Sequence, residues 1–149
     1  MDMNVVDFRK VKQNPLILVV ENVYETRAGI DTLLKADGYR VALASAEREA
    51  INITRLQQPD LILVSGSALP NNVLVKARGV RKEAGVDEGI PVVVFCAQDI
   101  SEGEEVAIGG NVYLTNPDNF NQLRRLIARL LVEASNGDII DGEEQTLEI

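Results

Sequence analysis

The sequence contains no histidine in 149 residues, and this absence removes several classes of chemistry. Imidazole is the side chain that most often exchanges protons near neutral pH, and it activates the nucleophile in Ser-His and Cys-His pairs. It is also a common zinc ligand. The sequence therefore excludes those hydrolase sites, histidine-bound zinc and a phosphohistidine relay, and we expect the chain not to be an enzyme.

Tryptophan is absent and aromatic residues make up 4% of the chain, so the stacking platforms of single-strand binding proteins are not expected. The distribution of charge also disfavours nucleic-acid binding. Six of the 23 acidic residues lie from Glu133 onward, where there is no base, and the first 132 residues balance 17 acids against 15 bases. This body has no basic stripe for phosphate backbones. The acidic tail is expected to be solvated, with a basic partner protein as the alternative.

The chain has one cysteine, Cys96, and lacks an apolar run of about 18 residues that could span a membrane. Its N-terminus has scattered charges and no apolar segment typical of a secretory signal. We therefore expect a cytoplasmic protein with no membrane contact and no internal disulfide. Cys96 lies in an apolar run and is expected to be a buried, inert thiol, with a redox sensor as the alternative.

Apolar runs alternate with segments of helical periodicity along most of the chain. Strands are predicted at 16–20, 39–43, 61–64, 92–96 and 112–114, and helices at 24–37, 46–56, 72–82 and 119–132. Gly38 is placed to end the first helix, and Ser45 to cap the second. Residues 101–110 contain three glycines and are the weakest helix candidate, expected to be short or loose.

Strands that are apolar throughout and separated by helices indicate a parallel sheet covered on both faces. Five such units predict an α/β fold of the flavodoxin-like, doubly wound kind, with three layers and the strand order 2-1-3-4-5. A site in this fold lies at the carboxyl ends of the strands. We expect an N-terminal extension (1–14), one domain (15–132) and an acidic, disordered tail (133–149) too short to form an output domain.

Five blocks of sequence, in their order and spacing, resemble the receiver domain of two-component response regulators. They are Ile17-Leu18-Val19-Val20-Glu21-Asn22, Gly38-Tyr39-Arg40-Val41, Pro59-Asp60-Leu61-Ile62-Leu63-Val64-Ser65, Ile90-Pro91-Val92-Val93-Val94-Phe95-Cys96-Ala97 and Tyr113-Leu114-Thr115-Asn116-Pro117. Together they span nearly all of the predicted domain. The resemblance implies the CheY-like version of the fold and a bacterial protein of phosphorelay signalling.

The resemblance also implies where the receiver phosphorylation site falls, and the residues there differ from the family pattern. The acidic pair that holds magnesium falls on Glu21 and Asn22, and the phosphoacceptor aspartate falls on Ser65. The hydroxyl that follows the phosphoryl group falls on Cys96, and the lysine that pairs with the phosphoryl oxygens falls on Asn116. Each difference removes charge or donor capacity from a single phosphoryl site. We therefore expect a degenerate site with no metal, no cofactor and no phosphotransfer.

Two features of the family pattern remain. Tyr113 matches the aromatic residue that moves on phosphorylation, and Asn116-Pro117 matches a Lys-Pro bond that is cis in many receivers, so we expect a cis bond here. In the family, the fourth helix, fifth strand and fifth helix form a contact surface for other proteins. The corresponding residues here are Asn111, Tyr113, Gln122, Arg125 and Arg129.

The sequence therefore predicts a stand-alone pseudo-receiver that binds an unknown partner protein, or itself, without phosphorylation. One alternative is a nucleotide or flavin binder using the loop Ser65-Gly66-Ser67. Another is a phosphoacceptor at Ser65, although no base or lysine stands by to activate its hydroxyl, and Gly66, the other match to the acceptor position, has none. A metal site made by Glu21 and Asp60 is not expected, because Asp60 lies at the opposite end of its strand.

Overall fold

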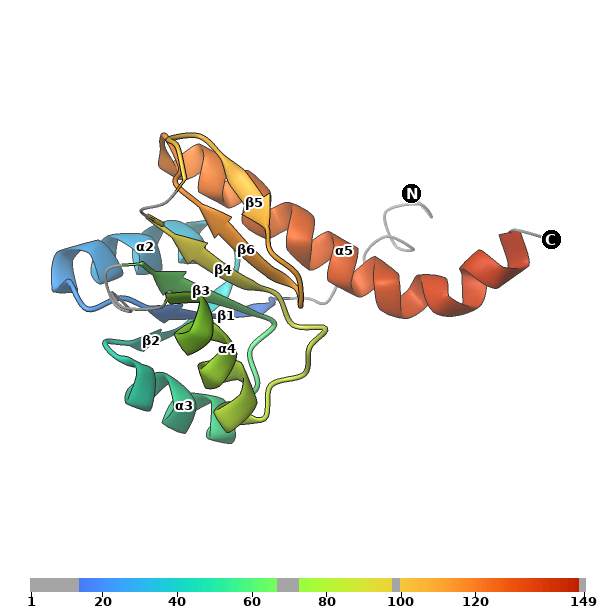
Figure 1. Ribbon diagram of the computed structural model, residues 1–149, viewed down its shortest axis with the longest axis horizontal. Helices are drawn as coiled ribbons and strands as arrows, with labels where there is room; N and C mark the ends of the chain where they lie inside the picture. The colour runs from blue at the N-terminus through green and yellow to red at the C-terminus, as the bar shows by residue number, and fades with distance from the viewer. Residues whose placement is uncertain (1–13, 67–72, 98–99, 148–149) are drawn as a thin grey trace.

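The computed structural model describes residues 14–66, 73–97 and 100–147, and it has the predicted three-layer α/β architecture (Figure 1). Its parallel strands are β1 (Leu16–Val20), β2 (Arg40–Ala44), β3 (Leu61–Ser65), β4 (Val92–Phe95) and β6 (Val112–Thr115). They lie in the order β2-β1-β3-β4-β6, so the predicted order 2-1-3-4-5 of the parallel strands is confirmed. A sixth strand, β5 (Glu105–Ala107), pairs antiparallel with β6 at the edge of the sheet.

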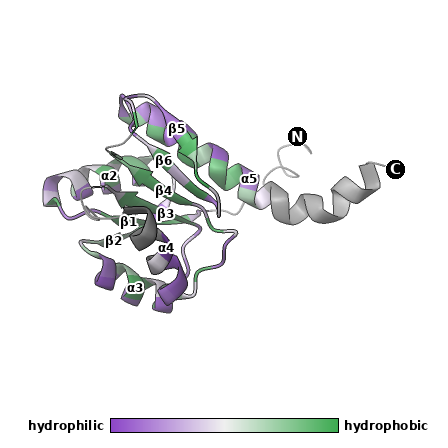
Figure 2. Ribbon diagram, viewed as in Figure 1, coloured by the Kyte–Doolittle hydropathy of each residue, from purple (hydrophilic) through white to green (hydrophobic). Residues whose placement is uncertain are grey.

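Four helices cover the two faces of the sheet. They are α2 (Tyr24–Ala36), α3 (Glu47–Leu56), α4 (Val73–Ala84) and α5 (Phe120–Leu147). Buried residues of α2 and α5 pack with one face of the strands, and those of α3 and α4 pack with the other. Figure 2 shows largely hydrophobic strands, whereas the coloured parts of the helices carry both hydrophobic and hydrophilic residues.

Alternation along the central strands builds these two cores. β1 and β3 are buried at all five positions. In β1, Ile17 and Val19 pack toward α2 and α5, while Leu18 and Val20 pack toward α3 and α4. Complete burial of each such side chain contributes roughly 1.5–3 kcal/mol. Strands buried on both faces need apolar residues at every position, which is why their sequence signal was strong.

The predicted end of α2 is confirmed, and the predicted N-cap of α3 is wrong. Gly38 ends α2 as predicted, because it adopts a φ of 95° and donates its N–H to the Lys35 carbonyl at 3.0 Å. Ser45 is not the N-cap of α3; Ala46 holds that position. The Ser45 N–H and hydroxyl instead donate to the Glu49 carboxylate, at 2.6 and 3.0 Å, which lowers the pKa of Glu49.

The segment predicted as a short or loose helix, 101–110, is a β-hairpin with β6. Gly103, Gly109, Gly110 and Asn111 all have positive φ angles, between 62° and 94°, which right-handed helices do not accommodate. β5 pairs with β6 between these turns, and the Ile108 N–H donates to the Val112 carbonyl at 3.0 Å. In the described residues between β4 and β6 there is consequently no helix.

The prediction of a cis bond at Asn116-Pro117 is wrong, since the described residues contain no cis peptide bond. Both backbone groups of Asn116 continue the hairpin pairing. Its N–H donates to the Glu104 carbonyl at 3.3 Å, and its carbonyl accepts the Gly103 N–H at 2.7 Å. Asn116, held through both backbone groups in this way, precedes the ordinary trans bond, which is the favoured isomer for X-Pro.

Helix α5 continues past its predicted end at Val132 to Leu147, and its second half projects away from the sheet (Figure 1). The segment expected to be a disordered tail from residue 133 is therefore largely helical in the structure. No proline follows Pro117, so no missing N–H interrupts the helix. Residues 1–13 of the predicted extension lie outside the described residues, and the division at 14 and 132 stays a prediction.

Candidate functional site at the carboxyl ends of the strands

Four of the predicted site residues lie at one edge of the sheet. Ser65 ends β3, and Glu21, Cys96 and Asn116 directly follow β1, β4 and β6. Parallel neighbours end at the same edge, and the chains leaving them stay in contact, since the Ala97 N–H donates to the Thr115 carbonyl at 3.2 Å. The structure thus brings these positions together as the sequence predicted.

Asp60 lies at the other edge of the sheet, before β3. Its carboxylate accepts the N–H of Leu16, the first residue of β1, at 2.7 Å. Glu21 follows the last residue of β1, so the two acids are separated by the full length of the strand. The structure thus places the two carboxylates at opposite edges of the sheet, as the sequence predicted.

Glu21 is the one acid among the predicted pocket positions, and its carboxylate is hydrogen-bonded to the backbone just before α2. Its side chain is 2% exposed, and its carboxylate accepts the Val23 N–H at 3.0 Å. Arg27 donates to the Glu21 backbone carbonyl at 2.8 Å. Asn22, beside it, is exposed. The described residues contain no group of three or more Cys, Asp or Glu that could hold a metal ion.

Ser65 is buried at the end of β3, with 1% of its surface exposed. The chain leaves the strand through Gly66, whose N–H donates to the Phe95 carbonyl at 2.7 Å. A Cβ at Gly66 would lie 2.6 Å from the Cys96 carbonyl oxygen, which is far inside van der Waals contact. Gly66 is the alternative match to the phosphoacceptor position in the sequence, and its structural role is to let the ends of β3 and β4 approach closely.

Asn116 is bound to the hairpin rather than standing free at the sheet edge. Besides its two backbone bonds, its side-chain amide donates to the Ile100 carbonyl at 3.3 Å. Thr115, which sequence analysis did not single out, is fully buried, and its hydroxyl donates to the Glu104 carbonyl at 3.1 Å. Both side chains at the end of β6 therefore anchor the segment 100–104.

Known proteins similar in sequence cover most of the chain, although no protein-family model matches it. The aerobic respiration control protein ArcA of Escherichia coli is 27% identical over 139 residues, which cover 91% of this chain and 56% of ArcA. An uncharacterized 14.6 kDa protein of Leptolyngbya boryana is 31% identical over 113 residues, covering 74% of this chain and 86% of that protein. Sporulation initiation phosphotransferase F of Bacillus subtilis is 24% identical over 127 residues, which cover 83% of this chain and 98% of that protein. The chain thus spans little more than half the length of ArcA.

Solved structures show the same fold. The receiver domain of the sensor histidine kinase PA1611 from Pseudomonas aeruginosa superposes with a TM-score of 0.61 at 24% identity, covering 79% of this chain and 98% of that domain. Chemotaxis protein CheY4 of Vibrio cholerae superposes with a TM-score of 0.58 at 19% identity, covering 78% of this chain and 98% of CheY4. The chain therefore has the fold of receiver domains.

Cys96 is not the buried thiol that the sequence predicted. β4 ends at Phe95, and Cys96 turns out of the sheet with a φ of 59° and an exposed side chain. Partial desolvation, and to a smaller extent the negative charge of Glu21, raise the pKa of the thiol. The expectation that the thiol is inert stays a prediction, and its reason is now the raised pKa, which keeps the thiol mostly protonated, rather than burial.

Replacement of Glu21 by glutamine is expected to lower the pKa of the Cys96 thiol and to speed its alkylation severalfold near neutral pH. Glutamine keeps an oxygen for the Val23 N–H but removes the charge that opposes the thiolate. The pH profile of iodoacetamide labelling measures this directly, since the chain has one cysteine. Glu25→Gln, an equal change of charge on exposed α2, is the control. Equal profiles for the wild type and Glu21→Gln would show that the Glu21 field does not reach the sulfur.

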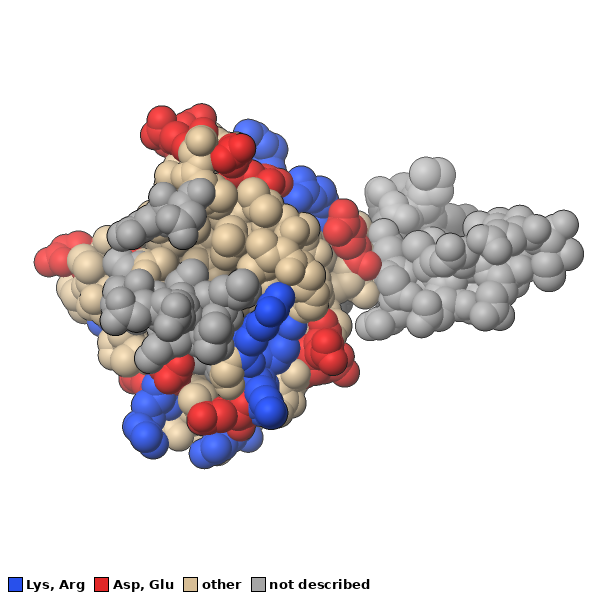
Figure 3. Space-filling view, viewed as in Figure 1, with Lys and Arg blue, Asp and Glu red and all other residues tan. Residues whose placement is uncertain are grey.

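The predicted interaction face differs from that of the family, because the β5–β6 hairpin occupies the place of the fourth helix. Within it, the Tyr113 hydroxyl donates to Asn111 at 2.9 Å, and Gln122 donates to the Gly103 carbonyl at 2.6 Å. Arg129 forms an ion pair with Glu105 at 3.0 Å. Figure 3 shows acidic and basic side chains gathered side by side at this end of the molecule. Most residues of the predicted face thus make contacts within the hairpin or between the hairpin and α5.

Arg125 is the exception within this predicted face. Its side chain is exposed, and among the described residues it makes no hydrogen bond or ion pair. Separately, no helix in the described parts of the chain combines the length and apolar composition that a membrane span requires.

Proposed function

We propose that this receiver domain signals without phosphorylation, by binding another protein in the cytoplasm rather than by catalysing a reaction. The observation that carries the proposal is that residues at the positions of the family's phosphoryl site are buried or make hydrogen bonds that hold the fold together. Asn116, where the family has its lysine, is bonded to the Ile100 carbonyl, and the Glu21 carboxylate is bonded to the Val23 N–H. Ser65, at the acceptor position, is almost completely buried.

Charge at this edge also supports the proposal. A phosphoryl group needs cations around its oxygens, and Mg²⁺ needs several oxygen ligands in near-octahedral geometry. Of the five matched positions, Glu21 carries a negative charge and the other four are neutral. An incoming phosphoryl group would therefore meet a slightly negative surface, and a single carboxylate is a poor magnesium ligand set. No observation favours the nucleotide or flavin alternative.

Incubation with acetyl phosphate and magnesium is expected to leave the mass of the protein unchanged. Intact-protein mass spectrometry measures this, with a receiver domain that has a complete phosphorylation site as the positive control. Ser65→Ala separates the two ways in which the expectation can fail. An adduct lost in Ser65→Ala would establish the serine as an acceptor, and an adduct that hydroxylamine removes would establish an acyl phosphate. Either adduct would overturn the proposal.

A further inference from the structure

Helix α5 carries opposite charges in its two halves. Residues 120–132 contain three arginines and no acid, while residues 133–147 contain five acids and no base. The helix macrodipole favours acids near the N-terminus and bases near the C-terminus, so this order opposes it. The charge pattern therefore does not stabilise an isolated helix, and it calls for another explanation.

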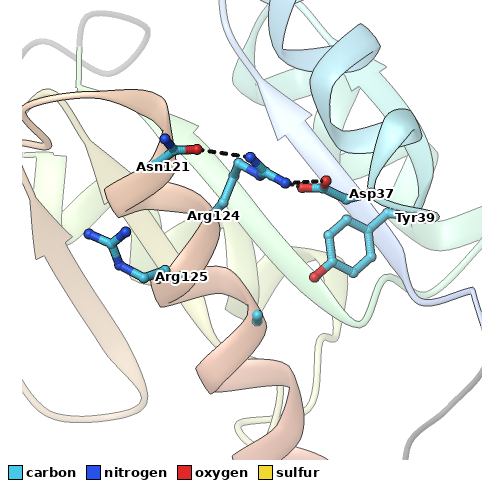
Figure 4. Close-up of a pocket in the computed structure, with 6 residues that line it drawn as sticks. Asp37, Tyr39, Asn121, Arg124 and Arg125 are labelled. Carbon is cyan, nitrogen blue, oxygen red and sulfur yellow. Dashed lines mark hydrogen bonds and ion pairs between the residues drawn. The ribbon is translucent and has the colours of Figure 1, made fainter.

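The arginine half of α5 borders a groove. The groove has a volume of about 450 Å³ and is lined by Asp37, Tyr39, Asn121, Arg124, Arg125 and Ala128. The four lining residues from α5 recur at the spacing of one helical face, and the turn between α2 and β2 supplies the other two (Figure 4). The groove thus runs beside α5 for about two turns.

Hydrogen-bond donors dominate the free polar groups of the groove. Arg124 reaches across to Asp37 and occupies both of its carboxylate oxygens, at 2.7 and 2.8 Å, and it also donates to Asn121 at 2.8 Å. The remaining groups are the Asn121 amide N–H, the Tyr39 hydroxyl and the Arg125 guanidinium, which points away from Asp37 in Figure 4. Desolvation and Asp37 raise the pKa of Tyr39, so its hydroxyl keeps its proton. Such a surface accepts carboxylates.

The acidic half of α5 is long enough to cover this groove, but it projects away from the groove of its own chain (Figure 1). At 1.5 Å per residue, residues 133–147 extend about 22 Å, and residues 121–128 about 12 Å. The acidic half projects away from the sheet, as Figure 1 shows. In an antiparallel pair related by a two-fold axis, the second half of each α5 faces the first half of the other.

We propose that two copies of this chain associate through antiparallel α5 helices, with the acidic segment 133–147 of each lying on the arginine-bordered groove of the other. Both contacts of such a pair are equivalent, so one charge pattern is used twice. This inference rests on the proposed function, since it takes the domain to work through protein contacts, and it names a second copy as the partner. It requires no phosphoryl group.

Sedimentation equilibrium of the full chain at increasing salt tests the pairing. The wild type is expected to be dimeric at low ionic strength and to dissociate as salt screens the charges. Arg125→Glu is expected to weaken the dimer by at least about tenfold, because it sets like charges against each other in both contacts. Arg55→Glu, the same change on an exposed residue of α3, is the control and should leave the dimer intact.

A charge exchange distinguishes specific pairing from a general loss of association. The double variant Asp141→Arg, Glu144→Arg is expected to dimerise weakly when it is alone, like Arg125→Glu. Mixing the two variants should restore dimers, since each acidic groove then meets the segment that carries the two new arginines, and each arginine-bordered groove meets an unchanged acidic segment. A wild type that stays monomeric at low salt, or a mixture that stays monomeric, would overturn the proposal. Either result leaves the acetyl phosphate experiment unaffected, so failure of this inference is separate from failure of the proposed function.

Discussion

Replacement of Gly66 by alanine is expected to destabilise the domain by about 2–4 kcal/mol. The new Cβ would lie 2.6 Å from the Cys96 carbonyl oxygen and 3.3 Å from the Phe95 carbonyl oxygen. Both neighbours are backbone atoms at the end of β4, so no side chain can rotate away, and the strand ends must separate. The Gly66 N–H bond to Phe95 would weaken with that separation. Urea denaturation followed by circular dichroism measures the change in unfolding free energy.

Gly29→Ala is the matched control, because it adds the same methyl group where there is room. Gly29 lies exposed within α2, and no atom lies within 4 Å of its added Cβ. Alanine in a helix interior is favoured over glycine by roughly 0.5–1 kcal/mol, so this variant should be more stable than the wild type. A Gly66→Ala protein as stable as the wild type would show that the strand ends are not in close contact.

Replacement of Arg81 by methionine is expected to cost about 2–3 kcal/mol and to loosen the β5–β6 hairpin. Arg81 is 7% exposed, and its guanidinium donates to the carbonyls of Ile90, at 2.7 Å, of Asn111, at 3.2 Å, and of Gly110. Methionine keeps most of the apolar bulk but leaves these carbonyls without their donor. Burial also lowers the pKa of Arg81, so removing the charge recovers some desolvation energy, and the net loss is smaller than three charged bonds.

The hairpin itself reports the loss in a second measurement. Amide exchange of Ile108, whose N–H donates to the Val112 carbonyl, should accelerate in Arg81→Met more than global destabilisation explains. Arg78→Met, on the same helix, removes an exposed arginine with one bond to the Ile108 carbonyl at 3.2 Å and should cost less than about 1 kcal/mol. Equal effects of the two variants would contradict the anchoring role of Arg81.

The parts of the fold that depend on buried apolar strands could be predicted from the sequence. Every position of β1 is apolar because both of its faces are covered, and the order of the parallel strands followed from the alternation with helices. The alignment of Glu21, Ser65 and Asn116 at one sheet edge followed from their positions directly at strand ends. These features arise from periodicity, which a single sequence displays.

The parts that depend on backbone conformation and long-range contacts could not be predicted. The glycines of 101–110 indicated a poor helix, but pairing of Glu105–Ala107 with β6 is a tertiary contact that local pattern does not display. Cys96 appeared buried because it extends an apolar run, whereas a positive φ turns it outward. The trans bond at Asn116-Pro117 follows from the same hairpin, which family resemblance did not include.

The central claim, that the site at the carboxyl ends of the strands does not respond to a phosphoryl group, is tested most directly by chemical-shift mapping. Magnesium and then beryllofluoride, a phosphoryl mimic, are added to the isotope-labelled full chain, with a receiver that has a complete site as positive control. The amide signals of Glu21, Ser65 and Asn116 are expected to stay in place at low millimolar magnesium and after beryllofluoride. Shifts clustered at these three residues would contradict the claim, because they would show that the site binds magnesium and a phosphoryl mimic.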